Sequence, residues 1–97
     1  MKYAFATTIL KNEDGADLPT TDKDPTPYTA AQALQRALLA DTPKNADTKL
    51  ERYELFLKLR SDAEDFTAPE VSFMREAALI YPTLLAGQLI RILDQKA

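Results

Sequence analysis

The chain has 97 residues, the length of one domain with a single core, and its 45% apolar and 28% charged residues predict a folded protein. It contains neither cysteine nor histidine. Their absence excludes disulfides and thiolate metal sites and removes the commonest general base of enzymes. The net charge of −3 argues against the basic surface that nucleic acids require. We therefore expect a single domain over residues 1–97, with no cofactor, no metal and no nucleic-acid partner.

Hydropathy argues against a membrane-spanning segment. No run of the sequence approaches the roughly 18 consecutive apolar residues of a transmembrane helix. The N-terminal stretch becomes polar at Lys11 and has no small-residue cleavage site, so it does not resemble a signal peptide. We expect a cytoplasmic protein without a membrane partner.

Residues 1–18 carry the signals of a short β-hairpin. The segment 2–11 alternates in the manner of a strand and is rich in aromatic and β-branched residues. Gly15 supplies the positive-φ position of a tight turn, and residues 16–18 can form the returning strand. Residues 19–28 contain three prolines among Thr and Asp, which predicts a stiff polar connector.

Four helices are predicted over residues 29–97. Three of them begin at a capping box, in which a threonine is followed three residues later by glutamine or glutamate. The boxes are Thr29 with Gln32, Thr48 with Glu51, and Thr67 with Glu70, and they predict helices over 29–40, 48–60 and 68–81. Pro82 breaks the third helix, and a fourth covers 83–95. The predicted fold class is mostly α, with a short N-terminal β-hairpin followed by a four-helix compact domain.

The predicted helix over 48–60 is apolar on two nearly opposite faces. The first face consists of Leu50, Tyr53 and Leu57, and the second of Leu55, Phe56 and Leu59. We assign the first face to the core, and one small core does not easily use both. Either the helix is sandwiched between layers of the fold, or its second face is buried against another chain.

Three further leucines project toward the polar sides of their own helices. As a set, they add to the apolar surface that a soluble protein does not need for its own core. The candidate interaction surface therefore comprises Leu39, Leu55, Phe56, Leu59, Leu79 and Leu84.

Gly87 lies inside the fourth predicted helix, where glycine costs about 1 kcal/mol relative to alanine. We expect a neighbouring backbone to approach closely at this position, and a ligand-approach site is the alternative.

The charged residues predict no catalytic apparatus. Glu54 and Lys58 have the spacing of a favourable helical ion pair. The acidic groups within 13–17 and 62–65 lack the ligand pattern of a calcium loop and are interpreted as solvated loops. No serine has a candidate base, so we assign no catalytic residue.

Two segments carry a resemblance to a known family. Residues 49–59 read KLERYELFLKL, and residues 81–89 read YPTLLAGQL. With the intervening APEV at 68–71, they resemble the KxxRYELxLKL and YPxLxxGQxxRxL helices of a family of small uncharacterised phage and prophage proteins. The match covers most of the chain after residue 45, while residues 19–28 look peculiar to this sequence. The resemblance implies a phage-associated gene product and carries no activity or catalytic residue.

The leading hypothesis is a non-enzymatic, phage-associated interaction protein: a regulator, an assembly factor or an inhibitor of a host protein, acting through an apolar helical surface. The alternative is a self-associating structural or assembly subunit, and the surplus apolar surface predicts a homo-oligomer. A third class, an enzyme using carboxylate, Lys, Tyr or Arg, requires converging groups with shifted pKa values in a pocket. An interaction protein captures a distinct partner, whereas a subunit binds only copies of itself.

Overall fold

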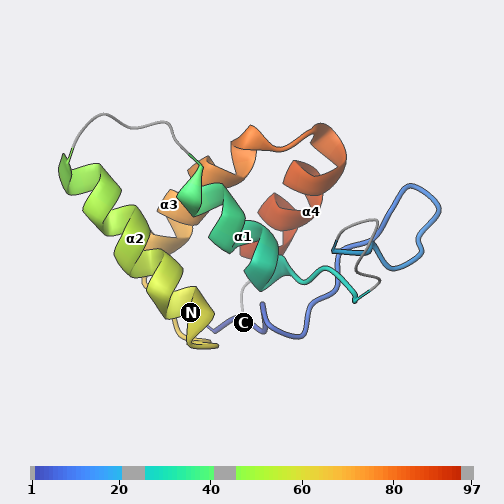
Figure 1. Ribbon diagram of the computed structural model, residues 1–97, viewed down its shortest axis with the longest axis horizontal. Helices are drawn as coiled ribbons and strands as arrows, with labels where there is room; N and C mark the ends of the chain where they lie inside the picture. The colour runs from blue at the N-terminus through green and yellow to red at the C-terminus, as the bar shows by residue number, and fades with distance from the viewer. Residues whose placement is uncertain (1, 21–25, 41–45, 95–97) are drawn as a thin grey trace.

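The computed structural model describes residues 2–20, 26–40 and 46–94. Within these residues the helices are α1 (Ala30–Leu39), α2 (Ala46–Arg60), α3 (Ala68–Ala77) and α4 (Thr83–Leu93), and a short 3-10 helix, η1 (Ala78–Ile80), joins α3 to α4 (Figure 1). The four predicted helices are confirmed. Helix α1 contacts α2, α3 and η1, and Figure 1 shows it in the middle, with α2 on one side and α4 on the other.

Two of the three predicted capping boxes are present. The Thr29 hydroxyl accepts a hydrogen bond from the backbone N of Gln32 (3.2 Å), and the Gln32 side chain accepts one from the backbone N of Thr29 (3.2 Å). Thr67 and Glu70 repeat this exchange at α3, with distances of 3.3 Å and 2.8 Å. Each box satisfies amides that the first turn of a helix leaves without an intrahelical partner.

Three helix boundaries differ from the prediction. Helix α4 ends at Leu93, and residue 95, where its end was predicted, lies outside the described residues. Helix α2 begins at Ala46, so Thr48 lies inside the first turn and is not the cap. The helix thus starts two residues before the predicted residue 48. The predicted helix over 68–81 divides into α3 and η1, because the residue before Pro82 disfavours helical geometry and the last turn tightens.

The predicted β-hairpin over residues 1–18 is not formed as a pair of strands, and the described residues contain isolated β-bridges but no strand. The segment 2–11 turns after Ala4, whose carbonyl accepts hydrogen bonds from the amides of Thr7 (3.2 Å) and Thr8 (3.0 Å). The Thr8 hydroxyl donates to the same carbonyl (2.7 Å). Local bonds of this kind compete with strand pairing, so the segment is divided in two.

The first half of this segment pairs with a loop far away in the sequence. The amide of Tyr3 donates to the carbonyl of Glu64 (2.7 Å), and Lys2 forms an antiparallel bridge with Asp65. The first residues of the chain therefore lie against the loop that joins α2 to α3, and only the second half of the segment pairs with residues 16–18.

The turn at Gly15 is confirmed. Gly15 has a φ of 82°, and its amide donates to the carbonyl of Asn12 (3.0 Å). Lys11 and Asp17 flank the turn with an antiparallel bridge and a side-chain ion pair. The turn thus resembles that of a hairpin, but the residues that flank it form isolated bridges and no two-stranded ladder.

Three backbone hydrogen bonds form a closed ring among Leu10, Leu18 and Tyr28. The amide of Leu10 donates to Tyr28 (2.8 Å), that of Tyr28 to Leu18 (2.7 Å), and that of Leu18 to Leu10 (2.9 Å). Each of the three segments donates to one neighbour and accepts from the other, which satisfies the backbone without a two-stranded ladder. The connector predicted over 19–28 leads back to this ring, and its residues 21–25 lie outside the described ranges.

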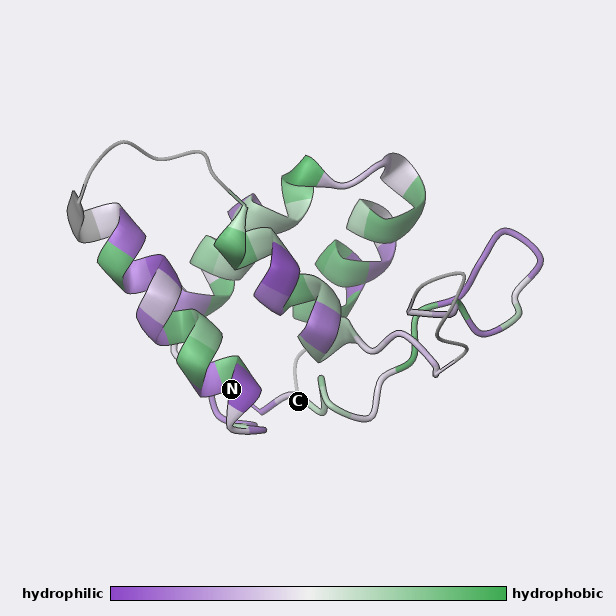
Figure 2. Cartoon of the chain, in the orientation of Figure 1, coloured by the Kyte–Doolittle hydropathy of each residue, from purple (hydrophilic) through white to green (hydrophobic). Residues whose placement is uncertain are grey.

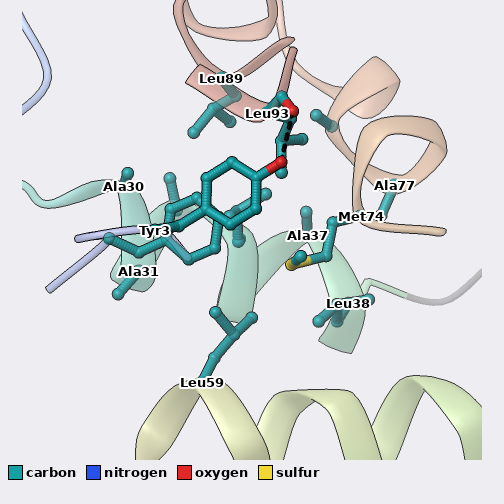
Figure 3. Packing of buried hydrophobic residues seen from close by; sticks show 14 of the residues in the cluster. Tyr3, Ala30, Ala31, Ala37, Leu38, Leu59, Met74, Ala77, Leu89 and Leu93 are labelled. Atoms are coloured by element: carbon teal, nitrogen blue, oxygen red, sulfur yellow. Dashed lines mark hydrogen bonds between the residues drawn. The ribbon is translucent and has the colours of Figure 1, made fainter. Parts of the chain in front are cut away.

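The core is built on α1. Its buried residues are mostly alanines: Ala30, Ala31, Ala33, Leu34, Ala37 and Leu38. Short side chains allow the neighbouring elements to approach the axis of α1 closely. Figure 3 shows Tyr3 among these residues, with its hydroxyl donating to the carbonyl of Leu93 (2.8 Å) and so joining the start of the chain to the end of α4.

Three aromatic rings hold the N-terminal segment in the core. Tyr3 and Phe5 stack with their centroids 4.9 Å apart, and Phe66 lies 5.3 Å from Phe5. Phe66 follows the turn after α2, where Asp62 takes the left-handed conformation with a φ of 60°. The amide of Asp62 bonds to Leu59 and that of the next residue to Lys58, the pattern of a Schellman motif that reverses the chain.

Tyr81 fixes the junction of η1 and α4 against α1. Its hydroxyl donates to the carbonyl of Ala33 (2.6 Å). Burial, together with the neighbouring Tyr28 phenol, raises the pKa of Tyr81 above its ordinary range. The residue before Pro82 is thereby hydrogen-bonded to α1.

The helices differ in their hydropathy. Figure 2 shows η1 and α4 as largely apolar, whereas apolar and polar residues alternate along α2. Among the described residues, no helix has both the length and the apolar character needed to cross a bilayer.

Gly87 does not meet another backbone, so the predicted close helix contact is wrong. Among the described residues, no atom beyond the adjoining backbone of α4 itself lies within 4 Å of the position that a Cβ would take, and the residue is exposed. The packing face of α4 consists of Ala86, Leu89 and Leu93, and Gly87 turns away from it.

Gly87→Ala should therefore stabilise the protein, because alanine removes the entropic cost of glycine in an open helix position. We expect the free energy of unfolding, measured by urea denaturation, to rise by about 0.5–1 kcal/mol. Gly15→Ala is the opposite control, since its positive φ makes alanine strained and should lower stability. A loss of stability in Gly87→Ala would mean that a backbone does approach this position.

Candidate interaction surface

The face of α2 that was expected to lie on the surface, with Leu55 and Leu59, is buried. Leu55 and Leu59 are buried in the core, and Figure 3 shows Leu59 reaching from α2 into the cluster. Phe56 is half-buried against the same core. The residues predicted to be buried are instead 40% to 55% exposed and form what we call the α2 stripe: Leu50, Tyr53 and Leu57. This finding corrects the assignment of both faces.

Arg52 lies on the buried side of α2 and contacts the end of α1. Its Nη1 donates to the carbonyls of Ala37 (3.1 Å) and Leu38 (3.4 Å) at the end of α1, and its guanidinium lies 5.7 Å from the ring of Phe73. The last carbonyls of a helix lack intrahelical partners and carry partial negative charge, so a cation is favourable there. With Arg52 held at the end of α1, the leucines on its side of α2 enter the core and the stripe faces outward.

The four other large exposed apolar residues of the described ranges lie in η1 or in the two helices, α1 and α4, that contact it. Leu39 ends α1, Leu79 and Ile80 lie in η1, and Leu84 lies in the first turn of α4. Their side chains are 41% to 64% exposed, and η1 contacts both α1 and α4. We call these four residues the η1 patch.

The structure does not gather the six predicted surface residues into one face. Leu55 and Leu59 are in the core, Phe56 is half-buried, and Leu39, Leu79 and Leu84 belong to the η1 patch. Sequence reasoning missed the α2 stripe as a surface, although its i, i+3, i+7 spacing was visible. It also missed the exposure of Ile80. This residue lies in η1, whereas the prediction placed it in one regular helix over 68–81.

A groove of about 270 Å³ lies between α2 and α3. It is lined by three glutamates and three apolar residues: Glu51, Glu54, Glu70, Leu55, Pro69 and Phe73. Glu54 is also a helical neighbour of the α2 stripe, four residues after Leu50 and three before Leu57. The groove and the stripe are therefore adjacent on one helix.

The ion pair predicted between Glu54 and Lys58 is replaced by another. The Nζ of Lys58 lies 2.8 Å from the carboxylate of Glu70 and 4.7 Å from the ring centroid of Phe66. The carboxylate of Glu70 also accepts the hydrogen bond of the capping box. Within the described ranges, the structure gives Glu51 and Glu54 no ion-pair partner.

Glu70 is stabilised in its charged form. Burial raises its pKa, but the hydrogen bonds from Lys58 and from Thr67, together with the charge of Lys58, outweigh burial and hold the pKa below the ordinary value of 4.5. This glutamate links α2 to the start of α3, because its two partners lie on different segments.

The acidic loops form no metal site in the part of the chain that the structure describes, where no three ligating side chains converge.

Comparison of the chain with family models, with curated proteins and with solved structures gives no match. The functional argument therefore depends on the surface itself.

The two faces of α2 should respond differently to the same chemical change. Leu50→Gln with Leu57→Gln should alter the free energy of unfolding by no more than about 0.5 kcal/mol at each site, because these side chains are exposed. Leu55→Gln with Leu59→Gln should lower it by about 4 kcal/mol or more, since large buried side chains cost 2–5 kcal/mol each when removed. Urea denaturation followed by circular dichroism measures both, and equal losses would contradict the assignment of faces.

Glu70 should contribute stability that depends on pH. Because its pKa is lower in the folded protein than in the unfolded chain, its contribution is present above pH 4.5 and is lost as pH falls through the folded pKa. Glu70→Gln keeps a capping acceptor but removes the charge. The difference in unfolding free energy between the wild type and this variant should shrink between pH 7 and pH 3, and a constant difference would show that the charge is not stabilising.

Proposed function

We propose that this chain is a non-enzymatic interaction protein that binds a partner protein through its exposed apolar helical surface. The observation that carries the proposal is the set of seven large apolar side chains that remain 40% to 64% exposed in the described residues. Single exposed apolar residues are ordinary, but grouped ones mark binding sites on soluble proteins. These seven fall into two groups, the α2 stripe and the η1 patch.

The α2 stripe has the form of a helical recognition surface. Leu50, Tyr53 and Leu57 share the i, i+3, i+7 spacing by which one helix contacts another or fills a groove. Tyr53 and Phe56 have ring centroids 6.3 Å apart, so an aromatic pair sits on this helix. Aromatic side chains are enriched among the residues that dominate binding energy, which makes Tyr53 the candidate anchor.

The proposed role is that of a regulator, an assembly factor or an inhibitor of a host protein. The motif resemblance to small phage and prophage proteins supports a phage-associated setting. The absence of histidine and cysteine from the sequence favours binding over turnover, since most nucleophilic and metal-dependent mechanisms use one or the other.

A tagged copy expressed in the native host should retain a specific protein. Leu50→Gln with Leu57→Gln, or Leu79→Gln with Leu84→Gln, should release that protein while leaving the helical content unchanged, because the substituted side chains are exposed. Quantitative mass spectrometry of the captured material measures the loss, and Glu13→Gln at the exposed N-terminal turn is the control. Equal retention by all variants, or turnover of a small molecule by the purified chain, would contradict the proposal.

Self-association is the second candidate, because the same stripe spacing suits pairing between two copies of α2. Light scattering of the wild type at high micromolar concentration distinguishes the two. A mass above the monomer that returns to the monomer in Leu50→Gln with Leu57→Gln supports the subunit hypothesis.

A further inference from the structure

The groove between α2 and α3 carries an inference about the chemistry of the partner. We propose that α2 binds a basic amphipathic segment of another protein, whose apolar side chains lie on the α2 stripe and whose Lys or Arg side chain enters the groove at Glu51 and Glu54. The inference rests on the proposed function and specifies the kind of partner.

The two halves of this surface are continuous along one helix. Glu54 lines the groove and lies one helical turn from both Leu50 and Leu57 of the stripe. A helix or extended segment lying along α2 therefore contacts the apolar stripe and the acidic groove at the same time. The apolar residues Leu55 and Phe73 line the groove beside the carboxylates.

The charge of the groove selects a cation. Lys58, the expected partner of Glu54, is bound to Glu70 at 2.8 Å. Within the described residues, this leaves Glu51 and Glu54 as carboxylates without an ion pair. Lys and Arg side chains place an apolar stem along apolar surface and a charged head at its edge, which is the combination that this groove presents.

The size of the groove suits one side chain. Its volume is about 270 Å³. A long basic side chain that extends from a segment on the stripe needs only part of such a space. Its charge would also be attracted by the net charge of −3 of the chain.

A second copy of the chain is a poorer occupant. The acidic flank at Glu51 and Glu54 would be present on both copies, so these two flanks would not attract each other. A basic partner adds an attraction that the stripe alone does not supply.

A synthetic peptide tests the inference on the full chain. The probe is a fluorescein-labelled helix of about 15 residues, with leucine at i, i+3 and i+7 and arginine on one flank, a length at which isolated helices are marginally stable. A second peptide carries glutamate in place of each arginine. Fluorescence anisotropy at physiological salt should show the basic peptide binding at least about tenfold more tightly than the acidic one.

The variants separate the groove from general electrostatic attraction. Glu51→Gln with Glu54→Gln should weaken binding of the basic peptide about tenfold, whereas Glu13→Gln with Asp14→Asn, the same charge change at a distant exposed turn, should weaken it less than about twofold. Leu50→Gln with Leu57→Gln should also weaken it. Equal weakening by the two charge variants, or no preference between the peptides, would overturn the proposal.

Two further outcomes are informative. A wild type that forms a dimer through the stripe, and whose dimer the basic peptide does not dissociate, would overturn the proposal in favour of a second copy. If the host protein is captured through the exposed leucines but the basic peptide does not bind, the chemistry of the partner is wrong while the proposed function stands.

Discussion

The close approach that α1 allows is the constraint on which the rest of the structure depends. Four of its ten residues are buried alanines, and α2, α3 and η1 all contact this one short helix. A helix with larger residues at these positions would hold its neighbours farther apart, since protein interiors pack to nearly crystalline density. Most of the large side chains of the core therefore come from other segments. The three clustered aromatic rings, Tyr3, Phe5 and Phe66, come from segments outside the helices.

The end of α1 contacts the side of α2 that faces the core. The carbonyls of Ala37 and Leu38 at the end of α1 accept hydrogen bonds from Arg52 of α2, and that of Ala37 also accepts one from the amide of Ala40. The orientation that brings Arg52 to α1 also buries Leu55 and Leu59 and exposes the α2 stripe. The contact of Arg52 with α1 and the exposure of the apolar surface that we assign to binding thus go together.

A second polar contact has a similar consequence. Lys58 bonds to Glu70 across the α2 to α3 turn, and Glu70 at the same time caps α3. Both partners are partly exposed, so the pair is of modest energy and its role is chiefly to connect two segments. Because Lys58 is engaged there, the carboxylate of Glu54 remains available beside the stripe. The acidic groove and the apolar stripe are therefore products of the same local packing.

The N-terminal region shows why residue alternation was not sufficient to predict a strand. Tyr3 and Phe5 are buried, as an alternating pattern anticipates, but Leu10, which belongs to the opposite face of that pattern, is buried as well, and Ile9 is only half-buried. The backbone between them nevertheless turns, because the carbonyl of Ala4 finds local donors in Thr7 and Thr8. Beyond the turn, the backbone groups of Leu10 pair with two different segments, an outcome that depends on the path of residues far along the chain.

By itself, the sequence determined the features that depend on a few consecutive residues: the four helices, the capping boxes of α1 and α3, the turn at Gly15 and the break at Pro82. Each of these follows from backbone preferences or hydrogen bonds within one turn. The tertiary structure decided which face of α2 is buried, that Lys58 pairs with Glu70, and that Gly87 faces open space. Those outcomes require a choice between nearly equal alternatives, two apolar faces of one helix or two carboxylates within reach of one lysine. Only contacts between segments distant in the sequence, such as Arg52 at the end of α1, supply the energy difference that makes the choice.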